Sequence, residues 1–369
     1  MKNNIIRPRI SVLIAALALA VLAMPFTPRN AGATDLRADL RADRSGTPNA
    51  TANSAAVLMY HRFAEPAHPS TNIRIDQFEA HIQELKSGPY TVVPLADVVA
   101  AMTGGKPLPD RAVAITIDDA YLSVYTEAWP RLRAAGFPFT VFVATSPVEA
   151  NLPGFMSWDQ IREMREAGAA IAAHTDGHLH MAEADPARNR REIKRSSQIM
   201  QRELGGTPKI FAYPFGETSR AIVDLIREHG YTAAFGQHSG IAYQGLSRFY
   251  LPRFALNETY GDLDRFRLVI NALPLTADGM TPGDPLLSDA NNPPAFGFTV
   301  NKQVRGLSRL ACYHSQSGQA SIERLGQSRI EVRFPAAFGV GRSRVNCTMP
   351  GPQGRWRWLG MQFYVKRRG

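Results

Sequence analysis

The chain has 369 residues, a length that suits one large domain together with a smaller one. Hydrophobic residues make up 44% and charged residues 20%, a composition that excludes disordered and collagen-like proteins. The net charge of +10 is unevenly spread, because residues 295–369 carry 13 basic and two acidic side chains. Residues 34–294 hold 25 basic and 30 acidic side chains, so the basic balance belongs to the two ends of the chain.

The N-terminus predicts export. Basic residues precede the apolar run ISVLIAALALAVLAMPF, and a small-residue A-x-A site ends at Ala33. This pattern is typical of a secretory signal peptide, residues 1–33. An uncleaved membrane anchor is the alternative, although the run is short for a span of about 20 residues. We expect a periplasmic or secreted protein, for which nucleic acid is an unsuitable partner. An anionic glycan or envelope surface suits the basic C-terminal region, and a solvated basic face is the alternative.

The segments that follow differ in composition and in the secondary structure they predict. Residues 34–53 are polar, contain the repeat DLRADLRAD and predict a flexible leader. From residue 54 to 275, short apolar runs that suit strands alternate with helical patterns. DQFEAHIQELKSG has an N-cap at Asp76, SWDQIREMREAG has a capping box, and AIVDLIREHG ends at glycine. This alternation predicts βαβ units and a parallel sheet or barrel.

The amino-acid composition changes again near residue 275. Residues 276–295 are rich in Pro, Gly, Asp and Asn, which indicates a linker. Residues 296–369 contain short strand-like runs, which predict a small antiparallel β domain, a sandwich. Cys312 and Cys347 are the two cysteines of the chain. In an exported protein they suggest a disulfide, and two buried thiols are the alternative.

Polar side chains follow several of the apolar runs directly. Because the C-terminal ends of parallel strands meet at one edge, these side chains are expected to lie together. Chance would scatter such residues over both ends of a sheet. The residues in question are His61, Asp118, Asp119, His174, His178, Pro214, Phe215 and Arg253.

Two imidazoles four residues apart and a carboxylate form a common zinc or iron set. Three protein ligands leave a position for water, whose pKa a divalent metal lowers. A second carboxylate beside the first would accept the proton of that water. His180 follows closely and is a competing ligand. Each motif alone is weak, but their conjunction at strand ends predicts a hydrolytic metal site.

The motifs resemble those of the polysaccharide deacetylase (NodB-homology, carbohydrate esterase) family. TIDDAY looks like the TFDDG-type first motif, HTDGH matches H-[ST]-x-x-H, and AYPFG resembles R-x-P-Y-G, in family order over residues 54–275. The start VLMYHRF is similar to the poly-N-acetylglucosamine deacetylase subgroup, in which the acid histidine precedes the aspartate pair. The resemblance implies an irregular (β/α) barrel of about seven strands.

The resemblance also implies a role for each matching residue. Asp118 would be the general base and His61 the general acid that protonates the leaving amine. Asp119, His174 and His178 would hold a divalent metal, with Zn²⁺ the usual ion. Oxyanion and substrate contacts would come from Tyr213, Pro214, Phe215 and Arg253, the oxyanion being held by the N–H of Phe215.

Two departures from the family pattern affect these roles. Ala212 stands where the third motif has arginine, and we expect Arg253 to supply that charge to Asp118. Ala120 replaces a glycine of the first motif, and Phe215 replaces a tyrosine. The expected activity is hydrolysis of carbon–nitrogen bonds other than peptide bonds, which releases acetate from N-acetylglucosamine units. The alternatives are a catalytically impaired glycan-binding protein and a metal-dependent amidase with a non-sugar substrate.

Overall fold

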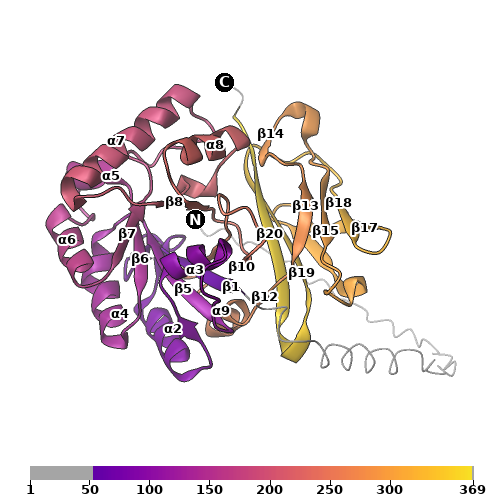
Figure 1. The fold of residues 1–369 in the computed structure, drawn as a ribbon, viewed down its shortest axis with the longest axis horizontal. Coiled ribbons are helices and arrows are strands. Elements are labelled where there is room, and N and C mark those ends of the chain that lie inside the picture. The colour runs from indigo at the N-terminus through magenta and orange to yellow at the C-terminus, as the bar shows by residue number, and fades with distance from the viewer. Residues whose placement is uncertain (1–52, 368–369) are drawn as a thin grey trace, which may run out of the picture.

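The structure is a computed structural model that describes residues 53–367 (Figure 1). The predicted signal peptide and all but the last residue of the predicted leader lie outside the described residues. Within residues 53–367, no helix combines the length and apolar character that a membrane crossing requires. Figure 1 shows two parts side by side, one of strands and helices in indigo through magenta to salmon and one of strands in orange to yellow.

The first part is built on a curled, mostly parallel sheet. Its strands follow the order β10-β1-β5-β6-β7-β8-β9, with β11 added to β1 and β4 added to β5. All seven residues of β5 are buried, as expected for a central parallel strand covered on both faces. The α/β class and the barrel-like sheet of about seven strands are therefore confirmed. The strands are β1 (Ser54–Tyr60), β4 (Thr91–Val92), β5 (Ala112–Asp118), β6 (Phe139–Val143), β7 (Ala170–Ala173), β8 (Ile210–Ala212), β9 (Ala233–Phe235), β10 (Ala242–Tyr243) and β11 (Phe254–Ala255). A small parallel pair, β2 (Arg62–Phe63) and β3 (Asn72–Ile73), follows β1.

Helices connect these strands, and Figure 1 shows α4 to α7 on the outside of the sheet, away from the second part. The predicted capping box is present, because Ser157 and Gln160 exchange hydrogen bonds at the start of α6. Asp76 is not an N-cap. The helix begins one residue earlier, at Ile75, and Asp76 pairs in its first turn with Arg74. The helices are α2 (Ile75–Ser87), α3 (Leu95–Met102), α4 (Trp129–Ala135), α5 (Thr145–Glu149), α6 (Trp158–Glu166), α7 (Pro186–Leu204), α8 (Arg220–Glu228) and α9 (Leu263–Ile270).

The second part, which we call the β unit, is a mostly antiparallel sheet folded around its own core. The aromatic rings of Phe296 in β15 and Phe363 in β20 lie 5.6 Å apart, although several strands separate β15 from β20 in the sheet. Two layers therefore face each other, which confirms the predicted small antiparallel β fold. Cys312 and Cys347 are directly paired residues of β16 and β19 and form a disulfide. The strands are β12 (Leu273–Pro274), β13 (Ala277–Thr281), β14 (Leu286–Leu287), β15 (Phe296–Val300), β16 (Ala311–His314), β17 (Gly318–Leu325), β18 (Arg329–Arg333), β19 (Gly341–Pro350) and β20 (Trp356–Val365).

The segment 276–295, which the sequence predicts as a linker, contains β13 and β14. β13 pairs with β15 and β14 with β20, so much of its backbone is hydrogen-bonded within the β unit. Proline and glycine mark where these short edge strands end, but they do not prevent pairing with a longer neighbour. A boundary near residue 275 remains our proposal. Contacts cross it, because the Tyr243 hydroxyl group is hydrogen-bonded to both backbone groups of Ala277.

Candidate active site

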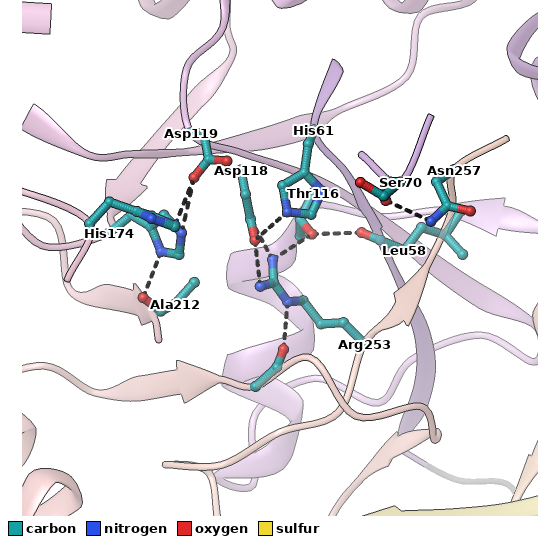
Figure 2. A network of polar contacts seen from close by, with 12 residues as sticks. Leu58, His61, Ser70, Thr116, Asp118, Asp119, His174, Ala212, Arg253 and Asn257 are labelled. Carbon is teal, nitrogen blue, oxygen red and sulfur yellow. Dashed lines mark hydrogen bonds and ion pairs between the residues drawn. The ribbon is translucent and has the colours of Figure 1, made fainter. Parts of the chain in front are cut away.

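The aspartate pair lies at the end of β5, and both carboxylates are buried. Successive side chains of a strand point to opposite faces, which would separate these two residues. The backbone turns after Asp118, because Asp119 and Ala120 both have positive φ, 77° and 60°. The N–H of Asp119 donates to the carbonyl of Phe142 at the end of the neighbouring strand β6 (2.9 Å). This turn places both carboxylates at the same edge of the sheet (Figure 2).

Asp118 is held by Arg253, as the sequence predicts. Arg253 donates from Nη1 to Oδ1 (2.6 Å) and from Nη2 to Oδ2 (2.8 Å), and neither side chain is exposed to solvent. Its other donors reach the carbonyl of Gly236 (2.9 Å) and the hydroxyl of Thr116 (3.1 Å). Burial raises the pKa of Asp118, but Arg253, His174 and His61 together outweigh burial and leave the pKa below its ordinary value. Asp118 is therefore a carboxylate at neutral pH.

Asp119 faces two imidazoles instead. Its Oδ1 lies 3.3 Å from Nε2 of His174 and 3.2 Å from Nε2 of His178, and these three atoms all lie within 4.8 Å of one another. Asp119 Oδ1 and His174 Nε2 are buried without a hydrogen-bond partner. Nδ1 of His174 donates to the carbonyl of Ala212 (2.8 Å), which leaves the lone pair of Nε2 for a ligand. Two imidazoles, one carboxylate and unsatisfied converging atoms fit a divalent metal ion.

His61 lies on the other side of Asp118, directly after β1. Its Nε2 is 3.9 Å from Oδ2 of Asp118, and 13% of its side chain is exposed. Burial lowers the pKa of His61, although both aspartates act in the opposite direction. Figure 2 shows Asp118 between His61 and the pair formed by Asp119 and His174. The site therefore combines a carboxylate, a titratable imidazole and a set of metal ligands.

The segment Tyr213–Gly216, which we call the motif loop, follows β8. Phe215 has φ 59° and ψ 3°, and its ring contacts His178 (4.5 Å between centroids) and stacks on His180 (3.9 Å). Pro214 is buried beside it. The prediction of a substrate contact is wrong for the Tyr213 side chain. That side chain is fully buried and its hydroxyl donates to the carbonyl of Phe249 (2.9 Å), because it points from the strand end into the barrel core.

A comparison with protein families identifies this arrangement. Residues 105–234 match the polysaccharide deacetylase family. This segment is similar to a polysaccharide deacetylase domain. The match includes the aspartate pair, both histidines of HTDGH and the motif loop, but it begins after His61 and ends before Arg253. The family match therefore does not include these two residues, which the geometry places in the site.

Curated relatives and solved structures are similar to slightly more than half of the chain. The poly-β-1,6-N-acetyl-D-glucosamine N-deacetylase of Staphylococcus aureus is 25% identical over 233 residues, which cover 56% of this chain and 80% of that protein. The enzyme of the same name from Escherichia coli K12 is 24% identical, over 52% of this chain and 35% of its own length. The structure of a de-N-acetylase from Aggregatibacter actinomycetemcomitans is 26% identical, with a TM-score of 0.51, and covers 58% of this chain and 99% of that one.

Backbone strain in the deacetylase domain is concentrated at the site. Ten described residues other than glycine have positive φ, and five of them lie in the three motifs. Ala120 is one of the five, which explains why glycine suits that position of the first motif. Such conformations persist only where the surroundings hold them. The five are Asp119, Ala120, Thr175, His178 and Phe215.

His180, the competing ligand in the sequence, has a different partner. Its Nδ1 lies 2.9 Å from Oε2 of Glu217, and it does not join the cluster of three ligand atoms. Burial raises the pKa of Glu217, while His180 acts against this shift. Glu217 was not predicted from the sequence. Its place directly after AYPFG is the only signal that could have drawn attention to it.

Proposed function

We propose that this chain hydrolyses the acetamide group of N-acetylglucosamine units in a poly- or oligosaccharide. Water and the acetamide give acetate and a free amine, so a neutral sugar becomes a cationic one. The observation that carries the proposal is the aspartate pair, in which Asp118 is ionised by Arg253 while Asp119 converges with two imidazoles. Such a pair supplies a base beside a metal site at neutral pH. The names of the S. aureus and E. coli relatives support the substrate class.

Asp119, His174 and His178 would hold a divalent cation, for which we propose Zn²⁺. Such an ion lowers the pKa of a water molecule and polarises the carbonyl group of the acetamide. The protein then has to take one proton from the water. Asp118 is placed for this transfer, since Arg253 keeps it ionised and fixes both of its oxygens.

The remaining steps stabilise the tetrahedral oxyanion and protonate the leaving nitrogen. The N–H of Phe215 would donate to the oxyanion, a contact that depends on the main chain alone and therefore tolerates phenylalanine in place of tyrosine. His61 would give its proton to the leaving amine. It lies next to Asp118, and its exposed edge allows it to regain a proton from solvent after each turnover.

We also propose that the protein acts outside the cytoplasm. The basic, apolar and small-residue pattern of residues 1–33 supports export, and the disulfide between Cys312 and Cys347 is compatible with an oxidising compartment. Residues 295–369 hold 13 basic and only two acidic side chains, and this positive charge supports contact of the region with an anionic glycan or envelope surface.

The test is acetate release by the metal-reconstituted full chain from β-1,6- and β-1,4-linked N-acetylglucosamine oligomers, with an N-acetylated peptide panel in parallel. We expect release from at least one oligomer series, which Asp118→Asn lowers by about 10²- to 10⁴-fold. Asp159→Asn, a matched change at a side chain that is 91% exposed in α6, should have no effect. Release from the peptides alone would support an amidase. Polymer binding without any release would support an impaired enzyme.

A further inference from the structure

The motif loop is held by the β unit as well as by the barrel. Gln362 lies in β20, is 1% exposed, and donates from Nε2 to the carbonyl of Phe215 (3.1 Å). The hydroxyl of Tyr250, from the barrel part, lies 3.0 Å from the carbonyl of Gly216 and 3.2 Å from the carbonyl of Gln362. The loop and β20 are thus joined by a side chain from each part of the molecule.

The conformation of the loop requires such support. Phe215 and the next residue, Gly216, both have positive φ, 59° and 69°. A Cβ atom at Gly216 would lie 2.5 Å from the backbone nitrogen of Gln237, so the chain passes too close for any other residue. A phenylalanine in the left-handed region is strained and keeps this conformation only if other contacts over-determine it. The hydrogen bond from Gln362 fixes the carbonyl of that strained residue.

Gln362 is itself oriented by its neighbour across the strand pair. Arg344 of β19 is paired with Gln362 in the sheet and donates from Nε to Oε1 of Gln362 (3.1 Å). Because the amide oxygen faces this guanidinium group, the amide nitrogen faces Phe215. The chain Arg344–Gln362–Phe215 therefore runs from the β unit to the residue whose N–H is proposed to hold the oxyanion. The ring of Phe215 also packs against His178, one of the proposed metal ligands.

We propose that Gln362 is a positioning residue of the deacetylase site, and that the β unit completes this site rather than only following it in the chain. This inference rests on the function proposed above. Gln362 acts through Phe215 and need not touch the substrate. Since the loss would fall on the oxyanion contact, it should lower kcat more than it changes KM. Gln362 lies outside the segment that matches the deacetylase family, residues 105–234.

The decisive variant is Gln362→Glu in the full chain. Glutamate keeps an acceptor for Arg344 but replaces the donor that faces the Phe215 carbonyl with a second acceptor. We expect kcat for acetate release to fall about 10- to 100-fold, the size typical of a small misplacement of a catalytic group, with KM within about twofold of the wild-type value. Asn346→Ala is the matched control. It removes an amide of β19 that bonds Trp358 (3.0 Å) and makes no contact with the motif loop, so kcat should be unchanged.

Hydrogen exchange of residues 213–217, followed by mass spectrometry, provides a readout that does not need activity. Exchange there should be faster in Gln362→Glu than in wild type and unchanged in Asn346→Ala, with thermal unfolding as the check that both variants are folded. An unchanged kcat and unchanged exchange in folded Gln362→Glu would overturn the proposal, as would equal losses of kcat in both variants. If the wild type released no acetate, the proposed function would fail, while the exchange experiment would still test the support of the loop.

Discussion

Asp118 and Asp119 are neighbours in sequence, yet they lie in two different electrostatic environments. Both oxygens of Asp118 accept hydrogen bonds from Arg253, so the chain itself supplies the opposite charge. Oδ1 of Asp119 has no hydrogen-bond partner and faces the ring nitrogens of His174 and His178. A buried carboxylate is costly unless it is paired. The first is paired within the chain, and the second is arranged for a cation that comes from outside.

The largest effect is expected for the base. Asp118→Asn should lower kcat by about 10²- to 10⁴-fold, the usual contribution of a general base. The affinity of the Asp118→Asn variant for a divalent cation should change little, because Asp118 is not one of the three residues whose ligand atoms converge. Acetate release and metal titration of the same preparation measure the two quantities. A variant that keeps more than a tenth of the activity would show that Asp118 is not the base.

Removal of the Arg253 guanidinium group, the positive charge that the chain itself supplies to Asp118, should lower the free energy of unfolding. Arg253→Met leaves Asp118 buried without its partner, and breaking a buried ion pair on one side costs about 3–5 kcal/mol of unfolding free energy. Urea unfolding measures this loss. The pKa of Asp118 should also rise, since burial is then opposed by His174 and His61 alone, so the acidic limb of the activity profile should move to higher pH.

The double variant Asp118→Asn/Arg253→Met sharpens this result. With both charges removed, the unfolding free energy should recover part of the loss caused by Arg253→Met alone. Additive losses would mean that the two side chains do not stabilise each other. If Arg253→Met left both activity and its pH profile unchanged, the assignment of Arg253 as the partner of the base would have to be abandoned.

Much of this comparison could be predicted from the sequence. Parallel strands end at one edge, so residues that directly follow apolar runs meet there even when they are far apart in sequence. This rule places His61, Asp118 and His174 together. Arg253 lies directly before β11 rather than after it, and its long side chain reaches Asp118 from there. The composition shift near residue 275 similarly predicted a change to antiparallel strands.

Other features depend on contacts that no local pattern encodes. Tyr213 belongs to a motif, but its direction is decided by the core around Phe249. Gln362 lies in a strand of ordinary sequence, and only the packing of β20 against the motif loop brings it to Phe215. The linker prediction rested on the proline and glycine content of residues 276–295, and composition alone does not show that β15 and β20 pair with parts of this segment.

Binding of a divalent metal ion at Asp119, His174 and His178 should give the next largest effect, on stability. A divalent metal at about 100 times its dissociation constant should stabilise the wild type by about 2.7 kcal/mol, because it binds the folded state alone. Asp119→Asn and His178→Gln should lose this stabilisation, whereas Arg253→Met should keep it. Unfolding with zinc and with a chelator measures the difference. Equal stabilisation of the wild type and of both ligand variants would place the metal elsewhere.

His81 can be compared with the histidines of the site, because both of its ring nitrogens already have partners within the chain. These partners are the Tyr60 hydroxyl (3.0 Å) and the Gly261 carbonyl (2.9 Å). Burial lowers the pKa of His81 from 6.5 to about 4. The unfolded state then binds more protons between these values, so stability falls as the pH falls through this range, by about 2 kcal/mol from pH 7 to pH 5. His81→Gln should make the pH dependence of urea unfolding shallower by that amount, and exposed His68→Gln should not. Equal slopes in the wild type and His81→Gln would mean that His81 does not gain its proton on unfolding.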